Sequence, residues 1–114
     1  MPFPIAIGDG AGTVATYHGC DTVTTTDKCS GTVFINHIGV VRAGDTNTPH
    51  TVPPDPPCPT HTVALSIYSP TVFVEGVGVG RMGDKYGAEE ITDAGQISVF
   101  ADGFTIEDDQ EANE

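Results

Sequence analysis

Seven residues of this chain could bind a metal ion through nitrogen or sulfur. Imidazole and thiolate groups suit zinc, which takes four tetrahedral ligands in structural sites. Most of these residues lie in stretches that are expected to be loops rather than strands. They are His18, His37, His50, His61, Cys20, Cys29 and Cys58. The residue types indicate a structural metal site, although each histidine alone is equally compatible with a polar loop residue.

Two of the cysteines stand close to histidines, in His18-Gly-Cys20 and in Cys58-Pro-Thr-His61. Neither spacing is that of a standard zinc finger. The number of cysteines is odd, and without a secretory signal a disulfide framework is a weak expectation. We therefore expect free or metal-bound thiols, with a Cys20–Cys29 bridge as the alternative under oxidising conditions.

A small zinc-dependent hydrolase is the alternative reading of the same histidines. Such an enzyme would leave one zinc position open for a bound water, with Glu89 or Glu90 as the base. The chain contains neither H-E-x-x-H nor G-x-S-x-G, and Ser66 and Ser69 have no obvious catalytic partner. We therefore expect no enzyme activity and keep the hydrolase as the alternative.

Composition and charge exclude several classes of function. The chain has 114 residues, which is enough for one domain. Its formal net charge is −12, so it is not expected to bind the phosphate backbone of nucleic acid. The same charge disfavours docking on anionic lipid. No apolar run is long enough for a membrane helix, and the N-terminus lacks the features of a signal peptide. We therefore expect no membrane helix and no signal peptide.

The elements that must position the histidines are β-strands. Val and Thr, which favour strands, are abundant, whereas Leu65 is the single leucine. Residues 32–45 align with 71–84 at an offset of 39 without a gap, and Thr, Val, Phe, Gly, Arg and Asp recur at matching positions. Residues 98–103 form a partial third copy, and 6–9 form a leading half copy. The chain is therefore built from three repeats.

Each repeat predicts two short strands joined by a tight turn. Asn36-His37, Glu75-Gly76 and Asp102-Gly103 are the predicted turns, so His37 is expected there as a polar residue. The fold is expected to be mainly β, a small loop-rich cone of three hairpin repeats with pseudo-threefold symmetry. We expect three phenylalanines to share a small core around its axis: Phe34, Phe73 and Phe100.

The hairpins are expected to form one domain over residues 1–106, with repeats at roughly 6–43, 44–82 and 83–106. Prolines make the loop at 48–61 stiff and prevent ladder pairing there. Five acidic residues in 107–114 predict a disordered acidic tail. Because the predicted hydrophobic core is small, a bound metal ion is expected to stabilise the fold.

The repeat resembles the PAAR-repeat family, in which the second strand of a hairpin reads Pro-Ala-Ala-Arg-x-Gly-Asp. The matching stretches are Gly39-Val-Val-Arg42-Ala-Gly-Asp45 and Gly78-Val-Gly-Arg81-Met-Gly-Asp84. The arginine and the Gly-Asp are kept, while Pro-Ala-Ala is not. The resemblance covers most of residues 5–106, and it implies that the arginines and the Gly-Asp pairs organise the loops between hairpins.

The resemblance also implies one structural zinc per chain, held by three histidines and a cysteine at the tip of the cone. His18, His50 and His61 match the histidine positions of the family. The family's cysteine follows the last Gly-Asp, where this chain reads Lys85-Tyr-Gly-Ala-Glu-Glu90. Cys58 is therefore the first choice for the fourth ligand, Cys20 the second, and Glu89 or a water the third.

PAAR-repeat proteins cap the trimeric β-helical spike of contractile phage tails and type VI secretion systems. The resemblance implies a non-enzymatic, membrane-piercing tip, located on the virion tail or on a secreted injection apparatus. It also implies that the chain is made in the bacterial cytoplasm, without a signal peptide. Its partners would be the spike, with one tip chain per three spike chains, and transiently the target cell envelope. The chain alone would be monomeric. A secretion-system effector adaptor is a further alternative.

Overall fold

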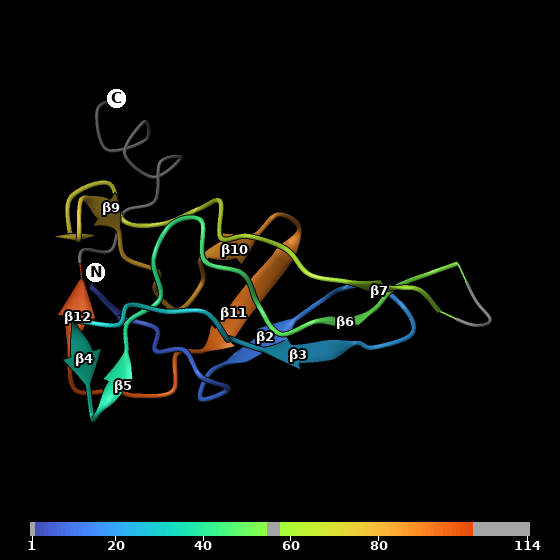
Figure 1. The fold of residues 1–114 in the computed structure, drawn as a ribbon, viewed down its shortest axis with the longest axis horizontal. Helices are drawn as coiled ribbons and strands as arrows, with labels where there is room; N and C mark the ends of the chain where they lie inside the picture. The colour runs from blue at the N-terminus through green and yellow to red at the C-terminus, as the bar shows by residue number, and fades with distance from the viewer. Residues whose placement is uncertain (1, 55–57, 102–114) are drawn as a thin grey trace.

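The computed structural model describes residues 2–54 and 58–101, and within them it is an all-β structure (Figure 1). Its strands are short, because turns and prolines interrupt the Val- and Thr-rich runs. The strands are β1 Phe3–Pro4, β2 Thr13–Ala15, β3 Val23–Thr25, β4 Phe34–Ile35, β5 Ile38–Gly39, β6 His50–Thr51, β7 Thr60–His61, β8 Phe73–Val74, β9 Val77–Gly78, β10 Lys85–Tyr86, β11 Glu89–Asp93 and β12 Phe100–Ala101. The prediction of a mainly β protein is confirmed.

The strands form one four-stranded antiparallel sheet and four two-stranded pairs. The sheet has the order β10-β11-β2-β3, and the pairs are β1-β12, β4-β5, β6-β7 and β8-β9. In Figure 1 the pairs β4-β5 and β8-β9 lie with β12 toward one end, which we call the hairpin end. The β6-β7 pair extends toward the other end. The pair β6-β7, which carries His50 and His61, is thus separated from the repeated hairpins.

The predicted turns of the first two repeats are present. Asn36 and His37 have φ of 53° and 68°, and Glu75 and Gly76 have φ of 55° and 84°. Two consecutive residues with positive φ form the turn whose twist matches that of the flanking strands. Phe34 then pairs with Gly39 across β4-β5, and Phe73 pairs with Gly78 across β8-β9.

The third repeat differs from the other two because its second strand comes from the N-terminus. Phe100 in β12 pairs with Pro4 in β1, in the way that Phe34 pairs with Gly39. The turn predicted at Asp102-Gly103 lies outside the described residues, as does the predicted acidic tail. The half copy noticed at residues 6–9 is therefore the continuation of the third repeat.

The three repeats meet in a closed ring of backbone hydrogen bonds. The Ala6 amide donates to the Gly80 carbonyl at 2.9 Å, Gly80 donates to Val41 at 2.8 Å, and Val41 donates back to Ala6 at 2.9 Å. Single β-bridges follow the same cycle, at Ile7–Val40, Arg42–Val79 and Ile5–Arg81. Each segment is thus bonded to the next and the third to the first.

Aliphatic residues, rather than the phenylalanines, pack next to this ring. Ile5, Val40 and Val79 each immediately precede one of the three bonded residues. The buried cluster there consists of Ile5, Ile7, Val40, Val79 and Ala101. Phe34, Phe73 and Phe100 are 54%, 58% and 49% exposed, so the prediction that they form the core is wrong.

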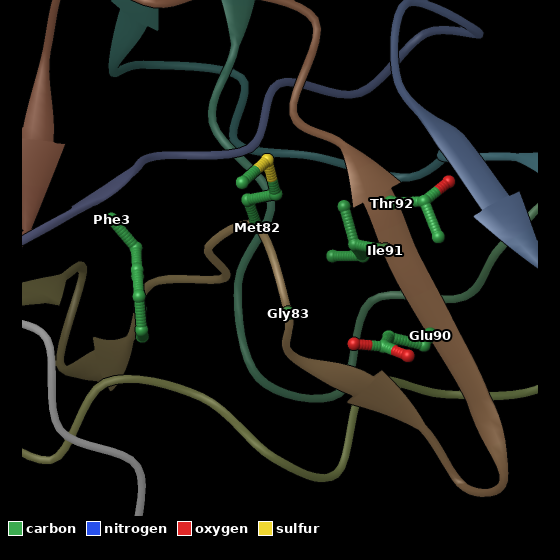
Figure 2. Close-up of a pocket in the computed structure, with 6 residues that line it drawn as sticks. All are labelled: Phe3, Met82, Gly83, Glu90, Ile91 and Thr92. Atoms are coloured by element: carbon green, nitrogen blue, oxygen red, sulfur yellow. The ribbon is translucent and has the colours of Figure 1, made fainter.

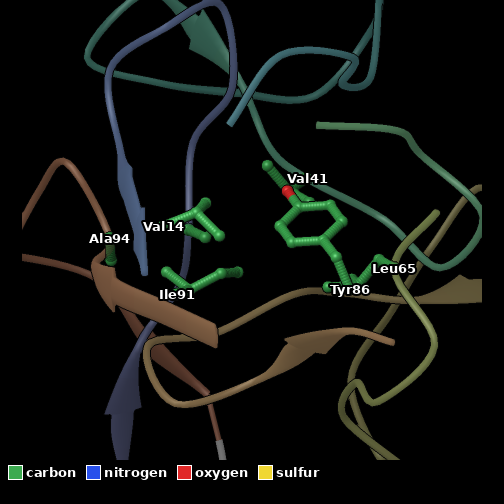
Figure 3. Packing of buried hydrophobic residues seen from close by; sticks show 7 residues of the cluster. Val14, Val41, Leu65, Tyr86, Ile91 and Ala94 are labelled. Atoms are coloured by element: carbon green, nitrogen blue, oxygen red, sulfur yellow. The ribbon is translucent and has the colours of Figure 1, made fainter. Parts of the chain in front are cut away.

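A second buried cluster lies between the ring and the four-stranded sheet (Figure 3). It consists of Ala6, Val14, Val41, Leu65, Tyr86, Ile91 and Ala94. Ala6 and Val41 therefore take part both in the ring and in this cluster. The cluster connects the ring to β11, the strand that begins at Glu89.

The Arg-x-Gly-Asp segments close the loops between repeats. In both copies the Asp carboxylate accepts two bonds from the guanidinium, at 2.9 Å each, and one from the backbone amide of the same arginine. Gly44 and Gly83, with φ of 87° and 93°, allow the tight turn between the paired residues. The expected role of Arg42 and Arg81 in organising these loops is thus seen in their contacts.

Candidate metal centre

Three histidines and one glutamate come together from four separate segments. His18 lies in the loop between β2 and β3, His50 is in β6, His61 is in β7, and Glu89 begins β11. His50 and His61 are opposite each other in the β6-β7 ladder, so their side chains are on the same face. The proline-rich stretch 48–61 contains this pair, although it was predicted to have no ladder pairing. Its prolines lie outside the two paired positions of each strand.

One carboxylate oxygen of Glu89 contacts all three imidazoles. Glu89 Oε2 is 2.7 Å from His18 Nε2, 2.8 Å from His50 Nε2 and 3.0 Å from His61 Nε2. The candidate ligand atoms of the four residues all lie within 4.8 Å of one another. Three nitrogens and one oxygen converging in this way could hold a single metal ion.

Hydrogen bonds on the far side of two rings select the tautomer that a metal needs. His18 Nδ1 lies 2.8 Å from the Gly19 carbonyl oxygen, and His50 Nδ1 lies 2.8 Å from that of Thr48. Since a carbonyl can only accept, Nδ1 carries the proton in both rings. The Nε2 lone pair of the neutral imidazole then faces the centre, which is the usual arrangement of a metal-binding histidine.

Asn47 holds the other oxygen of the glutamate. Its Nδ2 donates to Glu89 Oε1 at 2.8 Å, and its Oδ1 accepts from the Val63 amide at 2.9 Å. Asn47 is completely buried. Glu89 is therefore oriented so that only Oε2 is directed at the histidines. Sequence reasoning missed Asn47, because an asparagine in a loop carries no signal of such a role.

The electrostatics of the centre favour an ionised glutamate. Burial would raise the pKa of Glu89, but its polar contacts with His50, His18, Asn47 and His61 together lower it below its ordinary value. The pKa of His18 is raised, mainly by its bond to the Gly19 carbonyl and also by Glu89. Glu89 and His50 are buried, while His18 and His61 are partly exposed. One side of the centre is thus open to solvent.

The cysteines differ from the prediction. Cys20 and Cys58 form a disulfide, so neither thiol is free to bind a metal, and Cys58 is not the fourth ligand in this structure. The bridge is also not the Cys20–Cys29 alternative, since Cys29 has a free thiol. Cysteine pairing depends on which loops meet in space, and that information is not in the spacing.

The remaining candidates are also accounted for. His18, His50 and His61 are brought together as the resemblance implied, and Glu89, the third choice for the remaining position, joins them. His37 lies in the β4-β5 turn and is exposed, as expected of a polar turn residue. Three neutral imidazoles and a carboxylate are ligands that zinc and similar divalent ions accept, so the residues fit the expected metal. The identity of the metal is part of the proposal below.

Glu90 faces away from the centre. Successive side chains of a strand point to opposite faces, and Glu90 accepts a hydrogen bond from the Tyr17 hydroxyl at 2.6 Å. It also lines a cavity of about 310 Å³ together with Phe3, Met82, Gly83, Ile91 and Thr92 (Figure 2). The two adjacent glutamates therefore belong to different parts of the molecule.

A scan against protein-family models gave no match, and a search of curated proteins found no significant match. The resemblance to the PAAR-repeat family therefore rests on the repeat motifs alone. Within residues 2–54 and 58–101, no helix is long and apolar enough to cross a membrane.

Proposed function

We propose that this protein is a non-enzymatic tip that caps the trimeric β-helical spike of a contractile injection machine. In this proposal the chain is a small cone with pseudo-threefold symmetry, and one structural zinc stabilises the part farthest from the spike. The machine is a phage tail or a type VI-like secretion system. The observation that carries the proposal is the closed ring formed by Ala6, Val41 and Gly80.

The ring supports the proposal because a single chain with three equivalent segments can match a threefold partner. The three hydrogen bonds and the three bridges run in one cyclic order, with the N-terminal segment completing the third repeat. One copy of such a chain is enough to cover the end of a trimer. The proposed complex therefore contains one tip chain and three spike chains.

The exposed phenylalanines support docking at the hairpin end. Phe34, Phe73 and Phe100 stand at equivalent positions of three strand pairs, and about half of each side chain is exposed. An apolar side chain that recurs with the symmetry of the ring offers one contact to each chain of a trimer. Apolar groups gathered on a surface often mark an interaction site.

The metal centre supports a mechanical role. It joins the β2-β3 loop, the β6-β7 pair and the start of β11, none of which contributes to the ring. A bound ion would hold these segments together where the aliphatic clusters do not reach, as structural zinc does in small domains. A rigid point of this kind suits transient contact with a target cell envelope while the tail supplies the force.

The hydrolase alternative loses the two bases that the sequence suggested for it. Glu89 Oε2 is directed at the three imidazoles, where it would itself bind the metal, and Glu90 faces the opposite side of β11. The alternative predicts hydrolysis of an ester or peptide substrate by the zinc-loaded protein. Loss of that activity in Glu89→Gln, with unchanged folding, would favour it.

The proposed function is tested with the purified chain and a trimeric β-helical spike protein from the same genome. Native mass spectrometry is expected to show one zinc on a monomeric tip, and then a complex of one tip and three spike chains. Phe34→Ser with Phe73→Ser should weaken the complex without removing zinc. Met82→Ser, at another exposed apolar residue, is the control. Failure to bind any such spike would refute docking, and a metal-free monomer would refute the zinc centre.

A further inference from the structure

The disulfide connects two of the segments that carry the metal-binding histidines. Cys20 lies two residues after His18, and Cys58 lies three residues before His61. The bond therefore joins the β2-β3 loop to the loop of the β6-β7 pair, directly beside the candidate ligands. Its position suggests that it acts on the centre rather than on the rest of the fold.

Two of the histidines are held in place by other means. His50 and His61 are paired in the β6-β7 ladder, and His50 Nδ1 bonds to the Thr48 carbonyl. Glu89 is held by its pairing with Tyr86 across β10-β11 and by the buried Asn47. These three ligands would stay together if the disulfide were opened.

His18 depends more on the disulfide, because it lies outside any strand pairing. Thr16 holds the base of its loop through bonds to the Asp21 and Thr22 carbonyls, and the other polar contacts of the loop are exposed. Tyr17 and Cys20, on either side of it, have φ of 60° and 68°, in the left-handed region that non-glycine residues rarely adopt. The Thr51 amide and hydroxyl both donate to Asp21 Oδ2 at 2.8 Å, and these groups compete with water. Opening the disulfide would therefore loosen His18 selectively.

We propose that the Cys20–Cys58 disulfide is a redox-sensitive lock that keeps His18 at the metal centre. This inference rests on the metal centre of the proposed function, but not on docking to a spike. Cys20 is exposed and Cys58 is partly exposed, so a small thiol can reach the bond. Two reductant thiols give up two electrons and two protons, becoming a disulfide, and the protein disulfide becomes two thiols.

The lock makes retention of the metal depend on the surroundings. In an oxidising environment all four ligands are held and the ion stays bound. In a reducing cytoplasm the ion is held by His50, His61 and Glu89, while His18 moves in and out of reach. The chain would thus acquire its most rigid form only after it leaves the compartment in which it is made.

The test is the rate at which a strong chelator removes Co²⁺ or Zn²⁺ from the full-length chain. Cys20→Ser with Cys58→Ser is compared with the oxidised wild type, and Cys29→Ser is the matched control because that thiol is free. Changes around a metal's ligands commonly cost about ten- to a hundredfold in affinity. We expect release at least tenfold faster from the double variant and from reduced wild type, and unchanged release from Cys29→Ser.

Other readouts separate the lock from loss of folding and from failure of the proposed function. Circular dichroism should show the β fold in the double variant, and reoxidation of reduced wild type should restore slow release. Equal release rates in all proteins would overturn the lock. So would a thiolate-to-cobalt absorption band in reduced wild type, because a cysteine would then be a ligand. If oxidised wild type binds no metal, the lock and the zinc centre both fail, while spike docking is still measurable.

Discussion

Replacing Asn47 by alanine should destabilise the protein even without a metal. Asn47→Ala removes the buried 2.8 Å bond to Glu89 Oε1 and the partly buried 2.9 Å bond from the Val63 amide. A bond to a charged group contributes about 2 kcal/mol and a neutral one about 1 kcal/mol. Thr62 keeps a partner, since its hydroxyl also donates to the Asn47 backbone carbonyl. The free energy of unfolding should therefore fall by about 3 kcal/mol.

The same substitution should weaken metal binding. Without Asn47, the Glu89 carboxylate is free to rotate, and Oε2 is no longer held toward the histidines. Loss of such an outer contact typically lowers metal affinity about ten- to a hundredfold. Asn47→Asp is the informative companion, because it keeps an acceptor for the Val63 amide but places a second carboxylate against Glu89. It should raise the pKa of Glu89, and it should destabilise most at neutral pH and least near pH 5, where the pair shares a proton.

The assay is urea denaturation in the presence of a chelator, followed by a competition titration for zinc. Thr22→Ala, at an exposed residue of the β2-β3 loop, is the control and should leave both measurements unchanged. If Asn47→Ala loses less than about 1 kcal/mol and keeps its zinc affinity, the inferred role of Asn47 is refuted.

Three further predictions concern burial and charge. Tyr86→Phe should raise the urea midpoint by removing a buried hydroxyl that has no hydrogen-bond partner within the described residues, a gain of about 1 kcal/mol. Arg81→Leu should lower the free energy of unfolding by about 3 kcal/mol or more, because it removes the cation that pairs with buried Asp84. Arg42→Leu should lower it distinctly less, because the Arg42 side chain is 25% exposed whereas that of Arg81 is 0% exposed. In the metal-free protein, the lowered pKa of Glu89 stabilises the fold at pH values above 4.5, the ordinary pKa of glutamate. This contribution is lost as the pH falls through the lower pKa that Glu89 has in the folded protein. The raised pKa of His18 stabilises the fold fully at pH values below 6.5, the ordinary pKa of histidine. This contribution is lost as the pH rises through the pKa of His18 in the folded protein. Thermal melting should therefore show metal-free stability highest between pH 4.5 and 6.5. Stability in zinc should keep rising to about pH 7.5, because zinc needs neutral imidazoles; parallel pH profiles would contradict this.

Much of the fold could be predicted from local patterns. The Val-Phe runs and their turns predicted the strand pairs β4-β5 and β8-β9, because strand propensity and positive φ are local properties. The place of the phenylalanines could not be predicted. Whether Phe34 points to the axis or to solvent depends on how closely the three segments approach one another. The ring of backbone bonds decides this, and it joins residues 35 to 74 positions apart.

The metal centre was predictable to a similar extent. Three histidines were found from their loops and from the family resemblance, but Cys58 was the first choice for the fourth position and Glu89 only the third. Glu89 follows β10 in a stretch without a cysteine, and a glutamate in a turn gives no signal until β11 is known to lie beside β2. The disulfide was missed for the same reason, since Cys20 and Cys58 are 38 residues apart.

The hydrogen-bonding geometry of the centre favours a bound cation. His50 Nε2 and His61 Nε2 are only 2.8 Å apart, and both are close to Glu89 Oε2. His50 Nδ1 already carries a proton for Thr48, so neutral His50 can only accept at Nε2. The lone pair on His50 Nε2 then faces a lone pair on Glu89 Oε2, which is repulsive unless a proton lies between the two atoms. A divalent ion removes this conflict by accepting both lone pairs at once. Buried His50 and Glu89 are thus satisfied either by an added proton or by a metal, and a metal satisfies them while the imidazoles keep the neutral form that binds it.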